Sequence, residues 1–160
     1  LGAALGAACL LGCAGSAAAR DGVANAVSEK VQVESHNGKV LVRLTIDNQS
    51  DATVYVPRAV ATAPLLLGAR FEVRDSANGD PIEYVGPVVR PLPLGKADFL
   101  AVRPHTRHRN TIDITGAYAF MAGRHTYQLS YAGSYLADVS RLELYTPVEP
   151  DAVLFAFIGK

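Results

Sequence analysis

Hydrophobic and polar residues alternate along most of the chain after residue 30. In residues 40–46, every second side chain is Val, Leu or Ile, and the residues between them include an Arg and a Thr. Because successive side chains of a strand point to opposite faces, this segment is predicted to be a strand of about eight residues with one apolar face. Asn37-Gly38 precedes it, a pair typical of a two-residue hairpin turn. Residues 31–35 are therefore expected to form the first arm of a hairpin.

The same pattern predicts roughly eight to ten short strands, separated by turns at intervals of about 8–12 residues. Besides the hairpin, strands are expected at residues 53–56, 71–75, 82–85, 99–102, 110–114, 125–131, 136–145 and 153–158. No stretch has the period of an amphipathic helix. The chain has no Trp and no cysteine after position 13, which excludes an antibody-type domain. We therefore predict an all-β chain, an immunoglobulin-like antiparallel β-sandwich that forms a single domain over residues 30–160.

The first 19 residues are small and apolar, and no charge occurs before Arg20. This composition is typical of the core and cleavage region of a secretory signal. The usual start Met and basic leader are absent, so we expect the sequence to be truncated at its N-terminus. Leu10-Leu11-Gly12-Cys13 resembles the lipobox of bacterial lipoproteins, which implies a diacylglycerol on Cys13 and cleavage just before it. The alternative is a plain signal peptide cut near residues 17–19, with Cys13 discarded.

This N-terminal segment also sets the expected compartment. Both cysteines of the chain, Cys9 and Cys13, lie in it, so the mature domain has no thiol to pair. Ala14 rather than Asp follows Cys13, which by resemblance to sorted lipoproteins favours the outer membrane. Residues 1–19 are assigned to the signal and lipobox, and residues 20–29 to a short tether. We expect an exported protein, lipid-anchored to the bacterial envelope and facing the periplasm or the cell surface.

The formal charge is balanced, with 15 Lys and Arg against 15 Asp and Glu. A nucleic-acid partner calls for clustered cationic side chains, so this balance argues against one. It does not exclude a local patch. Four arginines occur in or near one predicted loop, and they are Arg103, Arg107, Arg109 and Arg124. One interpretation is a solvated polar turn, and the other is a small basic patch able to meet a carboxylate or a lipid head group.

Three histidines are candidate metal ligands. His105 and His108 lie in the same predicted loop, and His125 opens a strand that could lie nearby. Three imidazoles can hold zinc or copper in an open site. The neighbouring arginines oppose a divalent cation, so we predict no metal and no cofactor. The sequence also has no Gly-x-Ser-x-Gly nucleophile elbow and no glycine-rich phosphate loop.

Several stretches, taken in order, resemble one known type of domain. They are residues 41–52, 71–75, 98–104, 110–114, 123–131 and 150–153. Each is generic to β-sandwiches, but their order and spacing are similar to the non-catalytic β-sandwich domain that lies N-terminal to the protease domain of deuterolysin-like zinc metalloendopeptidases. The resemblance spans nearly the whole mature chain and implies its fold and its export. One departure is His105, which follows Pro104 where the family usually has Gly, so a differently shaped turn is expected there.

The resemblance does not extend to peptidase activity. The protease domain needs His-Glu-x-x-His on a helix, where two imidazoles hold zinc and the Glu activates water. The sequence has no such motif, and Lys160 comes directly after the last predicted strand, so we expect no protease domain within residues 1–160.

Two connections are unusually apolar for loops. One contains Leu65-Leu66-Leu67, and the other is the proline-rich stretch of residues 87–94. End loops of a sandwich often carry recognition on a rigid scaffold. The alternative is that both loops cover open sheet edges or core ends. Tyr135 is expected to be the most exposed tyrosine. The candidate partner-binding residues are therefore Leu65, Leu66, Leu67, Arg90 and Tyr135.

Together these patterns predict a non-enzymatic, lipid-anchored envelope lipoprotein that acts as a protein-binding module. By the resemblance, its partner is a peptidase, which it modulates or inhibits. Three alternatives stay open. The chain is the accessory domain of a truncated secreted zinc metalloendopeptidase, or a small metal-dependent hydrolase that uses His105, His108 and His125, or a purely structural envelope component.

Overall fold

Strands dominate the chain in the computed structural model, which describes residues 26–89 and 93–160. Within these residues there are ten strands and two single-turn helices. The strands are β1 (Val27–His36), β2 (Lys39–Asn48), β3 (Val54–Pro57), β4 (Phe71–Asp75), β5 (Phe99–Val102), β6 (Thr106–Asp113), β7 (Gly123–Tyr131), β8 (Gly133–Leu136), β9 (Tyr145–Val148) and β10 (Val153–Gly159). The helices are α2 (Arg58–Ala61) and the 3-10 turn η1 (Lys96–Asp98), and neither of these described helices is long enough to cross a membrane. Cys13 and Arg90 lie outside the described residues.

The first layer of the fold is the three-stranded antiparallel sheet β1-β2-β6. In the β1–β2 turn, Asn37 and Gly38 have φ angles of 52° and 72°, as the predicted two-residue hairpin requires. Val33 pairs with Val42, so the apolar positions of both strands share the inner face. The four even-numbered residues of β2 from 40 to 46 are completely buried, as the alternation predicts. β1 begins at Val27, inside the segment expected to be a tether.

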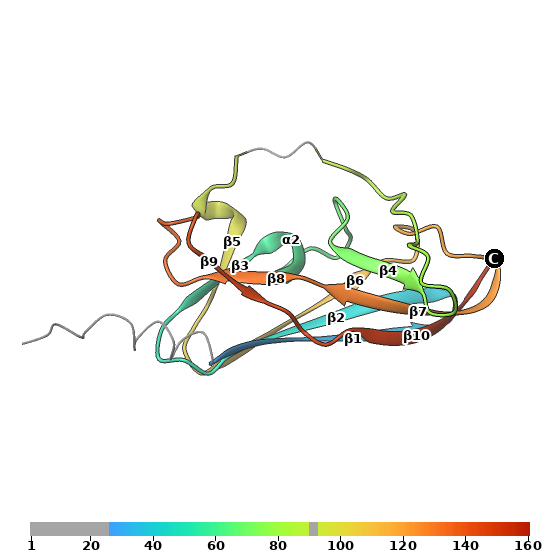
Figure 1. The fold of residues 1–160 in the computed structure, drawn as a ribbon. Helices are drawn as coiled ribbons and strands as arrows, with labels where there is room; N and C mark the ends of the chain where they lie inside the picture. Colours follow the sequence, from blue (N-terminus) through green and yellow to red (C-terminus); the bar gives the residue numbers. More distant parts are fainter. Residues whose placement is uncertain (1–25, 90–92) are drawn as a thin grey trace, which may run out of the picture.

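The second layer consists of two sheets, β10-β7-β4 and β5-β3-β8-β9. Only Ala132 separates β7 from β8, and Figure 1 shows these two strands end to end. β4 pairs with β7 and β3 pairs with β8, so β3 and β4 both lie beside the same line of strands. Residues 58–70 loop out between β3 and β4. The loop begins directly after Pro57, which has no N–H to continue a strand ladder.

The core fills the space between these layers and draws side chains from both of them. Phe120 lies within an aromatic group, with its ring centroid 5.1 Å from that of Tyr127 and 5.2 Å from that of Phe157, both edge-on. Along one side of the molecule, β1 of the first layer contacts β10 of the second. The described residues therefore confirm the predicted all-β antiparallel sandwich (Figure 1).

Two loops cover outer edges of the sheets. Leu65 forms an isolated bridge with Asp113 on edge strand β6, and Pro81 forms one with Arg74 on edge strand β4. The Asp113 N–H donates to the Pro64 carbonyl at 2.9 Å. These bridges engage backbone groups that an edge strand otherwise leaves open.

Two of the predicted strands are wrong. Residues 82–85 form no strand and have only an isolated bridge at Tyr84. Residues 136–145 are mostly a loop between β8 and β9. In this loop the Asp138 carboxylate accepts hydrogen bonds from the N–H and the hydroxyl of Ser140, at 2.8 and 2.6 Å. Such a local turn offers the backbone an alternative to strand pairing, which explains the break.

Candidate functional site

The two apolar loops are joined by the side chain of Tyr84. Its phenol oxygen accepts a hydrogen bond from the Gly68 N–H at 2.9 Å and donates one to the Pro87 carbonyl at 2.8 Å. The Leu66 carbonyl lies 3.4 Å from the same oxygen. The ring packs edge-on against Tyr118, with centroids 5.4 Å apart. This arrangement, which we call the Tyr84 clasp, holds both loops in a fixed relation to the sandwich.

Exposed apolar side chains flank the residues that the Tyr84 clasp joins. Leu66 is 2% exposed and anchors the first loop, whereas its neighbours Leu65 and Leu67 are 58% and 57% exposed. Val88, on the second loop, is 75% exposed, and Val85, two residues before that loop begins, is 55% exposed. We call Leu65, Leu67, Val85 and Val88 the apolar loop surface. Neighbouring exposed apolar side chains on a protein surface are typical of interaction sites.

Inward-facing polar side chains of β6 fix the base of the first loop. The Asn110 amide donates to the carbonyls of Val60 and Ala63, at 2.7 and 2.8 Å. The Nε2 atom of His108 lies 2.6 Å from the Ala61 carbonyl, and the ring nitrogen is the donor because the carbonyl can only accept. These bonds engage carbonyls that a short helix leaves free at its end. The first loop therefore leaves the sandwich at a defined position.

The predicted partner-binding residues are divided between surface and core. Leu65 and Leu67 are exposed, whereas Leu66 is buried. The prediction that Tyr135 is the most exposed tyrosine is wrong, because its side chain is 1% exposed. β8 is an inner strand of its sheet, and the strand alternation turns the Tyr135 ring toward the core. Burial also raises the pKa of this phenol. Tyr145, at the start of β9, is 65% exposed instead.

The three candidate metal-ligating histidines lie at separate places in the fold. In the β5–β6 turn, Nε2 of His105 is 2.7 Å from Oδ1 of Asp51. His108 lies on β6 and bonds the loop after α2, as described above. Nε2 of His125, on β7 of the other layer, is 3.0 Å from the Ala122 carbonyl. Over residues 26–89 and 93–160, no three His, Cys, Asp or Glu side chains gather to hold a metal ion. The idea that these three imidazoles converge is therefore wrong.

The buried side chain of Asn48 organises the turn after β2. Its Nδ2 donates to the Ala52 carbonyl at 2.8 Å, to the Val102 carbonyl at 3.0 Å and to the Arg103 carbonyl at 3.1 Å. Its Oδ1 accepts a hydrogen bond from the Ser50 hydroxyl at 2.7 Å. The amide thus ties this turn to the end of β5. The Asn-x-Ser passage, one of the resembled stretches, therefore has a structural role.

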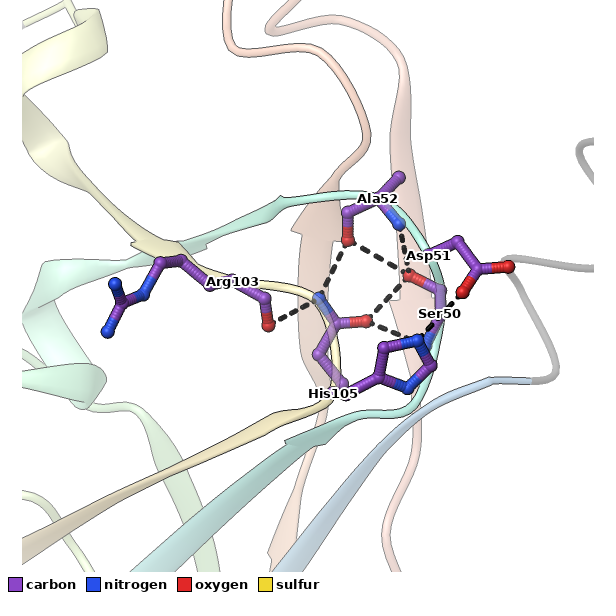
Figure 2. A network of polar contacts seen from close by, with 6 residues as sticks. Ser50, Asp51, Ala52, Arg103 and His105 are labelled. Carbon is purple, nitrogen blue, oxygen red and sulfur yellow. Dashed lines mark hydrogen bonds and ion pairs between the residues drawn. The ribbon is translucent and has the colours of Figure 1, made fainter.

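His105 lies at the position where the resembled family usually has glycine. Its φ angle is 54°, in the left-handed region that glycine adopts most readily. The turn therefore has a backbone conformation suited to glycine. Figure 2 shows the His105 ring directed at the Asp51 carboxylate, and both side chains are exposed. An exposed pair of this kind contributes little to stability.

The four arginines of the predicted basic patch do not share one surface. Arg103 lies in the β5–β6 turn, and Arg124 on β7 lies beside the β1–β2 turn. Arg107 and Arg109 point outward from β6, where they line a hollow together with cations of β1 and β2. The sequence pattern does not reveal these partners, because only the register of the three strands brings them together.

Glu29 is a carboxyl in the interior of the sandwich. It lies on β1 between Val27 and Val31, which share its inward face, and it is 8% exposed. Burial raises its pKa to about 7, and Oε2 has no hydrogen-bond partner among the described residues. Gly133 packs so close that any side chain there would collide with the carboxylate. The spacing of two from Val27 and Val31 is the sequence signal that could have placed Glu29 inside.

No protein-family model matches the chain, and no curated protein matches it. Among solved structures, it is similar to one described as "X-ray structure of Northeast Structural Genomics Consortium target SoR45". That similarity has a TM-score of 0.42 and 13% sequence identity, over 84% of this chain and 88% of the other. The description of that protein names no activity, ligand or partner.

Proposed function

We propose that this chain is a non-enzymatic lipoprotein of the bacterial envelope, which binds a protein partner through the apolar loop surface. The partner is a peptidase, which the chain modulates or inhibits. This choice follows from the resemblance of the sequence to the accessory domain of deuterolysin-like metalloendopeptidases. The lipid anchor at Cys13, inferred from the lipobox resemblance, keeps the sandwich at the membrane.

The observation that carries the proposal is the Tyr84 clasp. A loop that is already fixed loses less conformational entropy when a partner docks, and so more of the contact energy appears as affinity. Burying one exposed Leu or Val side chain contributes roughly 1.5–3 kcal/mol. The apolar loop surface offers four such side chains. The first loop is held at its start by the side chains of β6 and at its end by Tyr84, which also binds the second loop.

The test compares the full chain with the double variant Leu65→Asp/Leu67→Asp and with the control Leu154→Asp. Leu154 is 65% exposed and lies on β10, outside the apolar loop surface, so the control introduces one Asp at a similar exposure. Each protein is immobilised and exposed to a bacterial envelope extract. Captured proteins are identified by mass spectrometry, and the Kd of the purified partner is measured by calorimetry.

We expect the parent and Leu154→Asp to capture the same peptidase with similar Kd. The double variant should bind it at least tenfold more weakly, and the parent should change the rate at which that peptidase cleaves a peptide substrate. A double variant with unchanged Kd for every partner would refute the role of the loops. A partner without peptidase activity would refute the peptidase assignment.

A further inference from the structure

Charged side chains are collected in register on the outer face of the β1-β2-β6 sheet. Strand pairing sets Lys30 opposite Thr45, and Thr45 opposite Arg109, so these three residues form one row across the sheet. Arg43 lies in the next row, two residues away from Thr45 along β2. Residues two apart on a strand share a face, and so do residues of one row. All four side chains therefore lie on the same outer face.

These side chains line an open hollow of about 610 Å³. Its cationic lining consists of Lys30, Arg43, Arg107 and Arg109, and one carboxylate, that of Asp47, faces them. Hydroxyl and amide groups complete the lining. An excess of cations over carboxylates in a concave site favours an anionic ligand.

Two of the four cations already have carboxylate partners. Arg107 binds Asp47 through Nε and Nη2, at 3.0 and 2.5 Å. This contact and the amide of Gln49 hold the pKa of the Asp47 carboxyl below its usual range, so this carboxylate is charged at neutral pH. Arg43 binds Glu34 at 2.8 Å. These two arginines are therefore partly neutralised.

Lys30 and Arg109 differ from them, because neither has a carboxylate within ion-pair distance among the described residues. Neighbouring strands lie about 4.8 Å apart, which sets the backbones of these two residues about 10 Å apart with Thr45 between them. Both side chains are long enough to reach a group centred over the Thr45 hydroxyl. A phosphate monoester has nearly two negative charges at neutral pH and three acceptor oxygens, so it matches two free cations where a carboxylate matches one.

We propose that this hollow binds a phosphate monoester group, with the Lys30 ammonium and the Arg109 guanidinium as its charged ligands and the Thr45 hydroxyl as a neutral donor. The planar guanidinium can hold two oxygens of the phosphate at once. A phosphatidic-acid headgroup and a soluble phosphate ester both present this chemistry. The hollow does not include any residue of the apolar loop surface, so this site does not rest on the proposed function.

The test uses the full chain, the double variant Lys30→Gln/Arg109→Gln and the matched control Lys96→Gln/Arg124→Gln. Lys96 and Arg124 are exposed and lie outside the hollow, so both double variants lose one lysine and one arginine charge. Circular dichroism checks that all three proteins are folded. Glycerol 3-phosphate is titrated into each protein by calorimetry. In parallel, the proteins are co-sedimented with phosphatidylcholine vesicles that contain, or lack, phosphatidic acid.

We expect the parent and the control to bind at least one of the two phosphate probes, with affinity that falls as salt is added. Lys30→Gln/Arg109→Gln should bind that probe at least tenfold more weakly. Binding to glycerol 3-phosphate assigns the site to soluble esters, and binding only to the phosphatidic-acid vesicles assigns it to a membrane surface. An equal loss of probe binding in both double variants would overturn the proposal, because net charge alone would then explain the binding. A parent that binds neither probe would overturn it as well.

Discussion

Replacing Glu29 with Gln is expected to stabilise the fold at pH 8 and to flatten its pH dependence. Burial raises the pKa of this carboxyl from its ordinary 4.5 to about 7, so the folded chain holds the proton more tightly than the unfolded chain. The stability that Glu29 contributes is therefore fully present below pH 4.5 and is lost as the pH rises to about 7. A tenfold change in proton affinity corresponds to about 1.4 kcal/mol, so the ionised carboxylate costs the folded state roughly 3 kcal/mol above pH 7.

The assay is urea unfolding followed by circular dichroism, at pH 5 and at pH 8. The parent is compared with Glu29→Gln and with Glu34→Gln, an exposed carboxyl on the same strand. The gain in free energy of unfolding from Glu29→Gln should be larger at pH 8 than at pH 5 by roughly 2–3 kcal/mol. Asp47 and Asp113, whose pKa values are lowered, act in the opposite sense, but they are present in both proteins and cancel in the difference.

Glu34→Gln should change the free energy of unfolding by less than about 1 kcal/mol at either pH, because its ion pair with Arg43 is exposed. A gain from Glu29→Gln that is the same at both pH values would refute the reasoning. In that case the carboxyl would have the same proton affinity in the folded and unfolded chains.

Four other substitutions test contacts described above. Asn48→Ala leaves three backbone carbonyls without their donor and should lower the free energy of unfolding by about 2–4 kcal/mol in urea. Tyr84→Phe should cost only about 1 kcal/mol, but the Gly68 amide should exchange hydrogen faster; exchange at the parent rate would contradict the clasp. His105→Gly relieves a left-handed residue and should raise stability by up to about 1 kcal/mol, seen as a higher Tm; a lower Tm would argue against that strain. Gly133→Ala should cost about 1–3 kcal/mol because the new methyl displaces the Glu29 carboxylate, and an unchanged urea midpoint would contradict that packing.

The parts of the fold that follow from local rules could be predicted from the sequence. The β1–β2 hairpin needs only an Asn-Gly turn and period-two alternation, and both lie within about twenty residues. The strand expected at residues 136–145 was wrong because the Asp138 side chain makes a turn that the apolar pattern does not reveal. Tyr135 was predicted to be exposed because Gly133-Ser134 is typical of a loop. In the structure these residues belong to β8, an inner strand of its sheet.

The candidate sites depended more on pairing between distant strands. Leu65 and Leu67 were found because a run of leucines in a connection is unusual, but Tyr84, which fixes them, is recognisable only once its hydrogen bonds are known. Lys30 and Arg109 are separated by most of the domain in sequence and become neighbours through the register of β1, β2 and β6. The three candidate histidines do not converge, because His108 and His125 lie on strands of different layers and His105 lies in the β5–β6 turn.

The bridges at Leu65 and Pro81 have a consequence for how this molecule meets its own copies. A sheet edge with free backbone N–H and carbonyl groups can pair with the same edge of a second copy of the chain. In this sandwich, β1 and β10 contact each other along one side. The leucine loop covers part of the outer edge of β6, and the Pro81 turn covers part of the outer edge of β4. The leucine loop and the Pro81 turn thus also oppose strand pairing between copies at these two edges, and shortening either one should increase aggregation.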